Sequence, residues 1–149
     1  MAESFTAQVA AWANAVEGAH EAIFKESVQR LVTELNTLVP VGDTAFLRSS
    51  LQASSSAMPS LVRENPGIAD SDYVAEITLV IAGTELGETI YLGYTAKYAA
   101  RRHYGFVGAD SLGRTYSESG KPWVTMSAQR WPAIVAAVEA ETMARLSLN

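Results

Sequence analysis

One amphipathic pattern occupies about the first quarter of the chain and limits the shapes that the chain can adopt. From Ser4, a candidate N-cap, apolar residues recur at steps of three and four, which predicts a helix over residues 4–37. A continuous helix of this length measures about 50 Å at 1.5 Å per residue, whereas a compact domain of this size has a radius of gyration of only about 15 Å. The stripe consists of Phe5, Val9, Trp12, Val16, Ile23, Leu31, Leu35 and Leu38, with Ala19 and Ser27 on the same face.

This length leaves three alternatives for the N-terminal helix. It is an ordinary core helix, it breaks at Gly18, or it extends beyond its own core and packs on a neighbouring subunit. The third alternative predicts self-association, because apolar surface that a monomer leaves exposed is typical of an interface.

Composition favours one domain and excludes several chemistries. The chain has 149 residues, 48% of them hydrophobic, which is enough for a single domain over residues 1–149. It contains no cysteine, so disulfides, thiolate zinc sites and cysteine nucleophiles are excluded. The formal charge of −5 is opposite to the basic surplus typical of nucleic-acid binders. The sequence has neither an 18-residue apolar run nor a secretory signal, so we expect a cytoplasmic product without a membrane span.

The middle of the chain predicts a short helix, two loops and a β-hairpin. The short helix carries Phe46, Leu47 and Leu51, and serine-rich and turn-forming stretches follow at residues 54–60 and 63–72. Residues 73–83 are predicted as a strand with apolar groups on both faces, and residues 89–94 as a second strand with a period of two. The turn at 83–88 joins these strands into a hairpin that the N-terminal helix covers.

The last third of the chain predicts two helical segments around a loop. Residues 98–105 form a helical turn that Gly105 ends. Residues 107–121, with three glycines and few apolar groups, are predicted as a loop that is mobile until a partner docks. Residues 125–147 form the final helix, which Pro132 either opens or kinks. The predicted fold is therefore α+β: a long N-terminal helix on a small, mainly antiparallel sheet, with a short middle helix and a C-terminal helix.

Three segments resemble motifs of the tail-completion (neck or minor tail) proteins of tailed bacteriophages. PVGDTAFLRSSL at 40–51 resembles the family's Pro-Val-Asp-Thr-Gly-x-Leu-Arg-x-Ser motif. YAARRHYG at 98–105 is similar to its Tyr-Ala-x-x-x-acid-aromatic-Gly signature, and KPWVTMSA at 121–128 to its Arg-Pro-Phe-x-x-x-Ala segment. The chain departs from these motifs by an extra Gly42, by Ala45 in place of glycine and by His103 in place of an acid.

The resemblance implies a structural virion protein that assembles as a ring, expected to be a hexamer, at the head–tail junction of a long-tailed phage. It completes the tail, contacts the connector or head-completion proteins and the tail tube or terminator proteins, and leaves a channel through which DNA only passes. A tail terminator and a head-proximal connector ring are the alternatives within this class. We expect no enzymatic activity, cofactor, metal or membrane contact. Candidate oligomer or partner contacts are Leu47, Arg48, Tyr98, Arg101, Arg102, His103, Leu112, Tyr116 and Trp123.

Two other classes of function remain as alternatives. Lys97, Arg101 and Arg102 alternate with aromatic residues, which is typical of a nucleic-acid contact. We favour the simpler interpretation that the aromatics are core and that the arginines pair with acids. A small hydrolase would need the two histidines, His20 and His103, to converge, or a constellation of Asp43, Asp70 and Asp72. Two interpretations stay open for the first motif: Leu47 is core or a subunit contact, and Arg48 forms an ion pair within the domain or between subunits.

Overall fold

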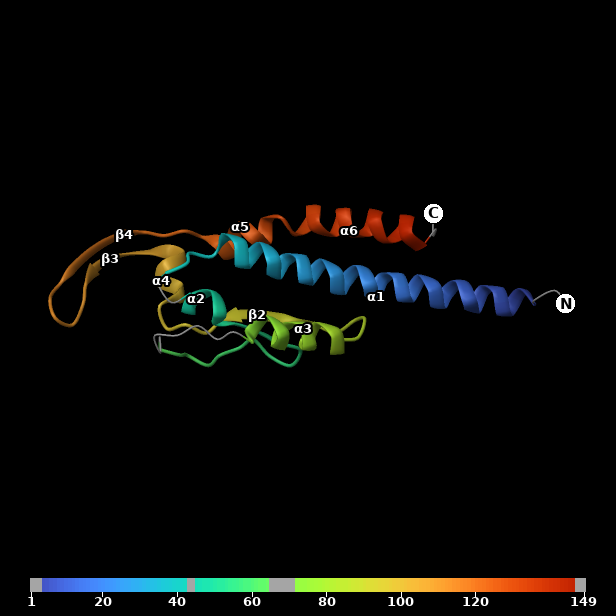
Figure 1. Ribbon diagram of the computed structural model, residues 1–149, viewed down its shortest axis with the longest axis horizontal. Coiled ribbons are helices and arrows are strands. Elements are labelled where there is room, and N and C mark those ends of the chain that lie inside the picture. Colours follow the sequence, from blue (N-terminus) through green and yellow to red (C-terminus); the bar gives the residue numbers. More distant parts are fainter. Residues whose placement is uncertain (1–3, 43–44, 65–71, 147–149) are drawn as a thin grey trace.

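The structure, a computed structural model, is an elongated α+β fold with a projection at each end (Figure 1). It describes residues 4–42, 45–64 and 72–146. In chain order the elements are α1 (Phe5–Leu38), α2 (Phe46–Ser49), β1 (Leu51–Ser54), α3 (Tyr73–Gly83), β2 (Tyr91–Tyr94), α4 (Ala99–Tyr104), β3 (Gly105–Ala109), β4 (Thr115–Ser119), α5 (Trp123–Gln129) and α6 (Trp131–Leu146). The strands form two antiparallel pairs, β1–β2 and β3–β4. The predicted fold class is confirmed.

Helix α1 is unbroken, and its first half has little tertiary cover. Ser4 caps it as predicted, since its Oγ accepts a hydrogen bond of 3.2 Å from the backbone N–H of Ala7. The break at Gly18, one of the three alternatives, is absent, because a glycine in an exposed helix interior costs only about 1 kcal/mol and the neighbouring alanines favour a helix. The first buried side chain is that of Ala19. Residues 5–18 therefore extend beyond the core, and we call them the N-terminal arm.

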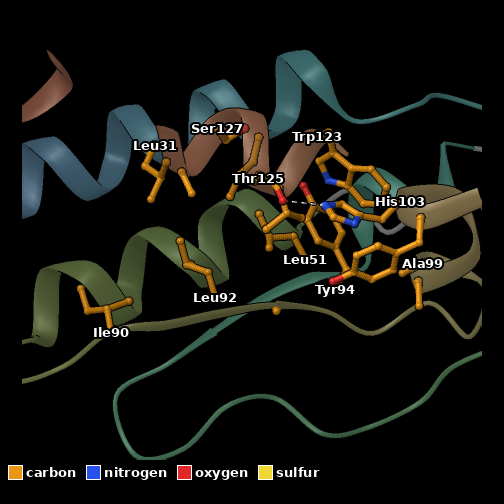
Figure 2. Close-up of a pocket in the computed structure, with 16 residues that line it drawn as sticks. Leu31, Leu51, Ile90, Leu92, Tyr94, Ala99, His103, Trp123, Thr125 and Ser127 are labelled. Atoms are coloured by element: carbon orange, nitrogen blue, oxygen red, sulfur yellow. Dashed lines mark hydrogen bonds between the residues drawn. The ribbon is translucent and has the colours of Figure 1, made fainter. Parts of the chain in front are cut away.

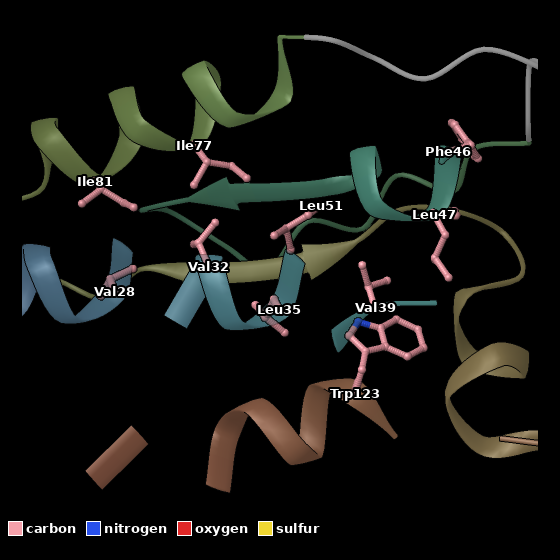
Figure 3. Close-up of a cluster of buried hydrophobic side chains, with 11 residues drawn as sticks. Val28, Val32, Leu35, Val39, Phe46, Leu47, Leu51, Ile77, Ile81 and Trp123 are labelled. Carbon is pink, nitrogen blue, oxygen red and sulfur yellow. The ribbon is translucent and has the colours of Figure 1, made fainter. Parts of the chain in front are cut away.

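The core lies where the second half of α1 meets the other elements. Helix α6 runs along one side of α1, and α3 with the β1–β2 pair lies on another side (Figure 1). Figure 3 shows α1 side chains pointing toward α3 and β1, with Trp123 closing the cluster from α5. The buried members are Val28, Val32, Leu35, Val39, Phe46, Leu47, Leu51, Ile77, Ile81, Ala96 and Trp123.

Residues 73–83 form helix α3, so the predicted strand at this position is wrong. Ile77 and Ile81, four residues apart, are buried, whereas Leu79 between them is 73% exposed. This is helical spacing. Short apolar runs rich in valine and isoleucine do not separate strand from buried helix by period alone, and here contacts with β1 and α1 favour the helix. A strand here would have exposed apolar groups on two faces, which would have been a second reason to expect self-association, and the helix removes that reason.

Strand β2 forms as predicted, but its partner is β1. Leu51 lies opposite Tyr94, and Ser54 lies opposite Tyr91. The predicted hairpin between residues 73–83 and 89–94 is therefore wrong, although the chain does turn after Gly83. Helix α2 holds two of the three apolar residues predicted for the short helix, and the third, Leu51, begins β1. Burial of Leu51 at 1% exposure, which only the three-dimensional fold provides, explains this change.

Residues 107–121 were predicted as a mobile loop, but most of them form the β3–β4 hairpin. Phe106 pairs with Glu118, and Ala109 pairs with Thr115. The turn between the strands uses Gly113 at φ 77°, a conformation that glycine adopts at no steric cost. The hairpin projects from the body at the end opposite the N-terminal arm (Figure 1).

The C-terminal helix is divided at Arg130 into α5 and α6. Pro132 is the second residue of α6, so it opens this helix, one of the two predicted roles. The serine-rich stretch after Ser54 has no regular structure, as predicted. Of the predicted turn-forming stretch 63–72, Arg63 forms an isolated bridge with Ala96, and residues 65–71 lie outside the described residues.

Candidate functional site

The three motif segments, far apart in the sequence, meet at one end of the body. The ring of Phe46 lies 6.3 Å from that of Tyr98. The ring of His103 lies 5.3 Å from that of Trp123, and the backbone N–H of Lys121 donates a 3.0 Å hydrogen bond to the carbonyl of Arg102. Helix α2, helix α4 and the start of α5 therefore form one contiguous cluster.

Three of the candidate contact residues are buried inside this cluster. Leu47 is 2% exposed, Trp123 is 1% exposed and His103 is 7% exposed. Trp123 packs edge-on against Tyr94 of β2, with ring centroids 5.2 Å apart. Leu47 is therefore core, one of its two predicted roles. These three side chains hold the surrounding surface in place and do not form it.

The first motif contains a strained residue where the family motif has glycine. Ala45 has φ 54°, and it is the one non-glycine residue in the described ranges with a positive φ. An L-residue pays about 1–2 kcal/mol in this left-handed region, and glycine does not. The backbone at this position therefore has the conformation that explains the glycine of the motif.

Arg48 has no ion-pair partner among the described residues. Its Nε atom is buried and makes no hydrogen bond with any of them. Its charge lies close enough to Tyr73 to act on the phenol, although burial is the larger effect and raises the pKa of Tyr73. Whether Arg48 pairs within the domain or with a neighbouring subunit therefore stays a prediction.

Arg101 ties the β3–β4 hairpin to helix α4. Its Nε and Nη2 atoms donate hydrogen bonds of 2.8 Å each to the two carboxylate oxygens of Glu118. The guanidinium also lies 4.3 Å from the ring centre of Phe106 and 4.5 Å from that of Tyr116. A paired, planar contact of this kind fixes orientation as well as charge. The predicted pairing of an arginine with an acid is confirmed for Arg101.

The Arg101–Glu118 pair predicts a pH-dependent contribution to stability. The hydrogen bond from Arg101 lowers the pKa of Glu118, so its stabilisation is present above the ordinary glutamate range of roughly pH 4 to 5 and is lost below it. We expect Glu118→Gln to be less stable than the wild type in urea near neutral pH, and this difference to disappear near pH 3. Glu85→Gln, at an exposed turn glutamate, is the control. A Glu118→Gln deficit that persists at low pH would contradict the ionic origin of the effect.

The hairpin tip is ordered by one carboxylate. Asp110 accepts hydrogen bonds of 2.9 Å from the backbone N–H groups of Leu112 and Arg114, and 3.1 Å from the hydroxyl of Tyr116. Leu112 is 76% exposed at this tip, and Val107 is 82% exposed on β3. The tip is thus a defined surface that presents apolar groups to solvent.

An apolar groove runs along α1 between β2 and the pair α5–α6 (Figure 2). Its largest part has a volume of about 470 Å³ and is lined by Leu31 of α1, Leu92 of β2 and Val124 of α5, among others. Leu31 and Ile90 also line a second hollow of about 330 Å³, which reaches Trp131 of α6. Trp131 in turn borders a third hollow of about 340 Å³. These three hollows are neighbours that share lining residues, and we call them together the α1 groove.

The walls of the α1 groove hold buried polar atoms without partners. His103 Nδ1 and Ser127 Oγ make no hydrogen bond with any described residue, whereas the Tyr94 hydroxyl and Trp123 Nε1, which are also buried, lie close enough to interact with each other. All four residues line the largest part of the groove, and Figure 2 shows His103, Tyr94 and Trp123 grouped at its α4 end. Burial raises the pKa of Tyr94. A buried polar atom without a partner costs about 1–3 kcal/mol, and such atoms occur both in the groove and at Arg48 Nε outside it.

The residues that the nucleic-acid and hydrolase alternatives would need lie in different parts of the structure. Lys97 pairs with Glu64 at 3.0 Å, whereas Tyr104, predicted to be core, is 80% exposed. His20 borders the third hollow of the groove, and His103 contacts Thr125 at 3.4 Å at the α4 end. Asp43 and Asp70 of the predicted acidic constellation lie outside the described residues. In the described ranges no group of three or more His, Cys, Asp or Glu side chains is placed to hold a metal ion.

No protein-family model, curated protein or solved structure matches this chain. Across residues 4–42, 45–64 and 72–146, no helix has both the length and the apolar character needed to cross a membrane.

Neither the α1 groove nor the ordered β3–β4 hairpin was predicted from the sequence, and the reasons differ. The hairpin has a readable signal, since Asp110 and Gly113 stand where a tight turn between strands needs an aspartate and a glycine. The groove has none, because its walls come from elements far apart in the chain, such as Ile90 and Trp131.

Proposed function

We propose that this protein is a ring-forming structural subunit at the head–tail junction of a long-tailed bacteriophage, where it completes the tail and docks it to the head connector. The observation that carries the proposal is the meeting of the three motif segments in one cluster, through Phe46–Tyr98, His103–Trp123 and the Lys121–Arg102 hydrogen bond. Chance resemblances to the three motifs would not be expected to lie together in the folded chain. The left-handed backbone at Ala45 adds independent support.

The shape of the chain supports assembly into a ring. The N-terminal arm and the β3–β4 hairpin project from opposite ends, and each carries exposed apolar side chains, Trp12 on the arm and Leu112 on the hairpin. Exposed apolar groups at two distant places suit contacts between successive subunits. The ring would leave a channel through which DNA passes, in a virion formed in the bacterial cytoplasm. A tail terminator and a connector ring share these features and stay as alternatives.

A nucleic-acid-binding module is less well supported. Arg101 is fully engaged by Glu118, and Lys97 pairs with Glu64. Together with the net charge of −5, this pairing leaves few cations for phosphate contacts.

Light scattering during size-exclusion chromatography tests the proposed assembly. We expect a ring-sized mass at high protein concentration or together with a neck or tail partner. A monomer mass at every concentration, and also in material released from purified particles, would contradict the proposal.

A further inference from the structure

We infer that the α1 groove receives the N-terminal arm of a second copy of this chain. The inference rests on the proposed ring, and it names the contact that would join neighbouring subunits. The groove is the acceptor and the arm is the donor, so each copy carries both halves of the interface.

The arm has the pattern of a helix that binds in a groove. Phe5, Val9 and Trp12 are spaced by four and three residues, so they lie on one face of α1. They are 80%, 46% and 64% exposed, respectively. An amphipathic helix that docks in a groove presents anchors at this spacing. The alanines between them keep the arm helical without tertiary contacts.

The groove suits a helix better than a strand. A strand would add to the outer edge of the sheet beyond β2, but Arg63 already occupies the end of that edge. Its N–H donates to the carbonyl of Thr95 at 2.7 Å, and its carbonyl accepts from the N–H of Lys97 at 2.8 Å. The open space instead lies along α1, beside Leu31 and Trp131, where the side chains of a docked helix can enter.

Charge identifies a copy of this chain as the occupant. Residues 1–20 contain two acids and no lysine or arginine, whereas residues 97–121 contain five lysines or arginines, three of which pair with Glu64, Glu118 and Asp110. The other two, Arg102 and Lys121, are exposed beside groove-lining residues such as His103 and Trp123; they form no ion pair with any described residue, and their backbones are hydrogen-bonded to each other. The acidic N-terminal segment of one copy therefore complements the basic end of another.

The placement of the two halves produces head-to-tail assembly. The arm projects from one end of the molecule, and the basic α4 end of the groove lies toward the other (Figure 1). A contact between different surfaces of identical subunits repeats from copy to copy, and it forms a ring when the rotation closes.

Cysteine cross-linking tests this contact directly, because the wild-type chain has no cysteine. We pair Val9→Cys on the arm with Val124→Cys or with Ile90→Cys on opposite walls of the groove, and treat each full-length variant with a short bismaleimide. Both pairs are expected to give a ladder of covalent multimers. The matched control pairs Val9→Cys with Leu79→Cys, which is 73% exposed on α3 and outside the groove. It is expected to give no ladder.

The outcomes separate the inference from the proposed ring. Wild-type assembly by light scattering without a ladder from either groove position would overturn the inference and leave the ring intact. Cross-linking of Val9→Cys alone into dimers only would mean that two arms pair with each other, and would also overturn it. A wild-type chain that never assembles would contradict both the ring and this contact.

Discussion

Gly105→Ala is expected to destabilise the fold by about 3 to 5 kcal/mol. Gly105 has φ 84° and ψ 175°, a region that is essentially restricted to glycine. A Cβ at this position would lie 2.6 Å from the carbonyl oxygen of Glu118 and 2.7 Å from the backbone nitrogen of Gly120. Backbone strain and overpacking each contribute about 1–3 kcal/mol. Urea unfolding followed by circular dichroism measures the effect.

Gly18→Ala is the matched control for this substitution. A Cβ on Gly18 would have no neighbour within 4 Å, and the residue is exposed in the interior of α1. We therefore expect Gly18→Ala to raise stability by about 0.5–1 kcal/mol. A Gly105→Ala variant as stable as the wild type would show that the approach of α4 to the hairpin is not as close as described.

Trp123→Ala and Trp12→Ala are expected to separate folding from assembly. Trp123 is 1% exposed where the three motif segments meet, so its truncation should cost about 3–5 kcal/mol of unfolding free energy. Trp12 is 64% exposed on the arm, so its truncation should leave the free energy of unfolding of the monomer within about 0.5 kcal/mol of wild type. The same Trp12→Ala variant should lose multimers at concentrations where the wild type assembles.

Chemical unfolding of the two variants checks the stability half of this prediction, and light scattering checks the assembly half. A Trp12→Ala chain that assembles like the wild type would remove the arm from the interface. A Trp123→Ala chain with unchanged stability would show that the meeting point of the motifs is not part of the core.

Local features of the fold could be predicted from the sequence. The Ser4 cap, the length of α1 and the stop at Gly105 depend on residues close together in the chain, and all three are present. Pro132 at the start of α6 is also a local signal, because it acts on the first turn of its own helix. Each of these signals acts within one or two helical turns, so it does not depend on the rest of the fold.

Features that depend on distant contacts could not be predicted in the same way. Residues 73–83 have the composition of a strand, but burial of Ile77 and Ile81 against β1 and α1 makes them a helix. Strand β1 was missed because its four residues gain their order from β2. The hairpin appeared too poor in apolar groups to be ordered, since the stabilising stack of Arg101 on Phe106 and Tyr116 joins separate segments.

The burial of the candidate contact residues could be predicted only in part, for similar reasons. The three motif segments do lie together, and Arg102 of the 98–105 segment and Leu112 of the hairpin tip are exposed. Sequence reasoning did not show that Leu47, His103 and Trp123 face inward, because inward and outward positions in a short helix depend on what packs against it. The groove could not be predicted from any one segment, because its walls come from α1, β2, α4, α5 and α6.

Negative-stain electron microscopy of the purified wild-type protein tests the central claim most directly. At concentrations where light scattering reports a mass above that of the monomer, the proposed function predicts rings with a central hole wide enough for DNA. Small featureless particles at every concentration, together with the absence of such rings from the necks of purified virions, would contradict it.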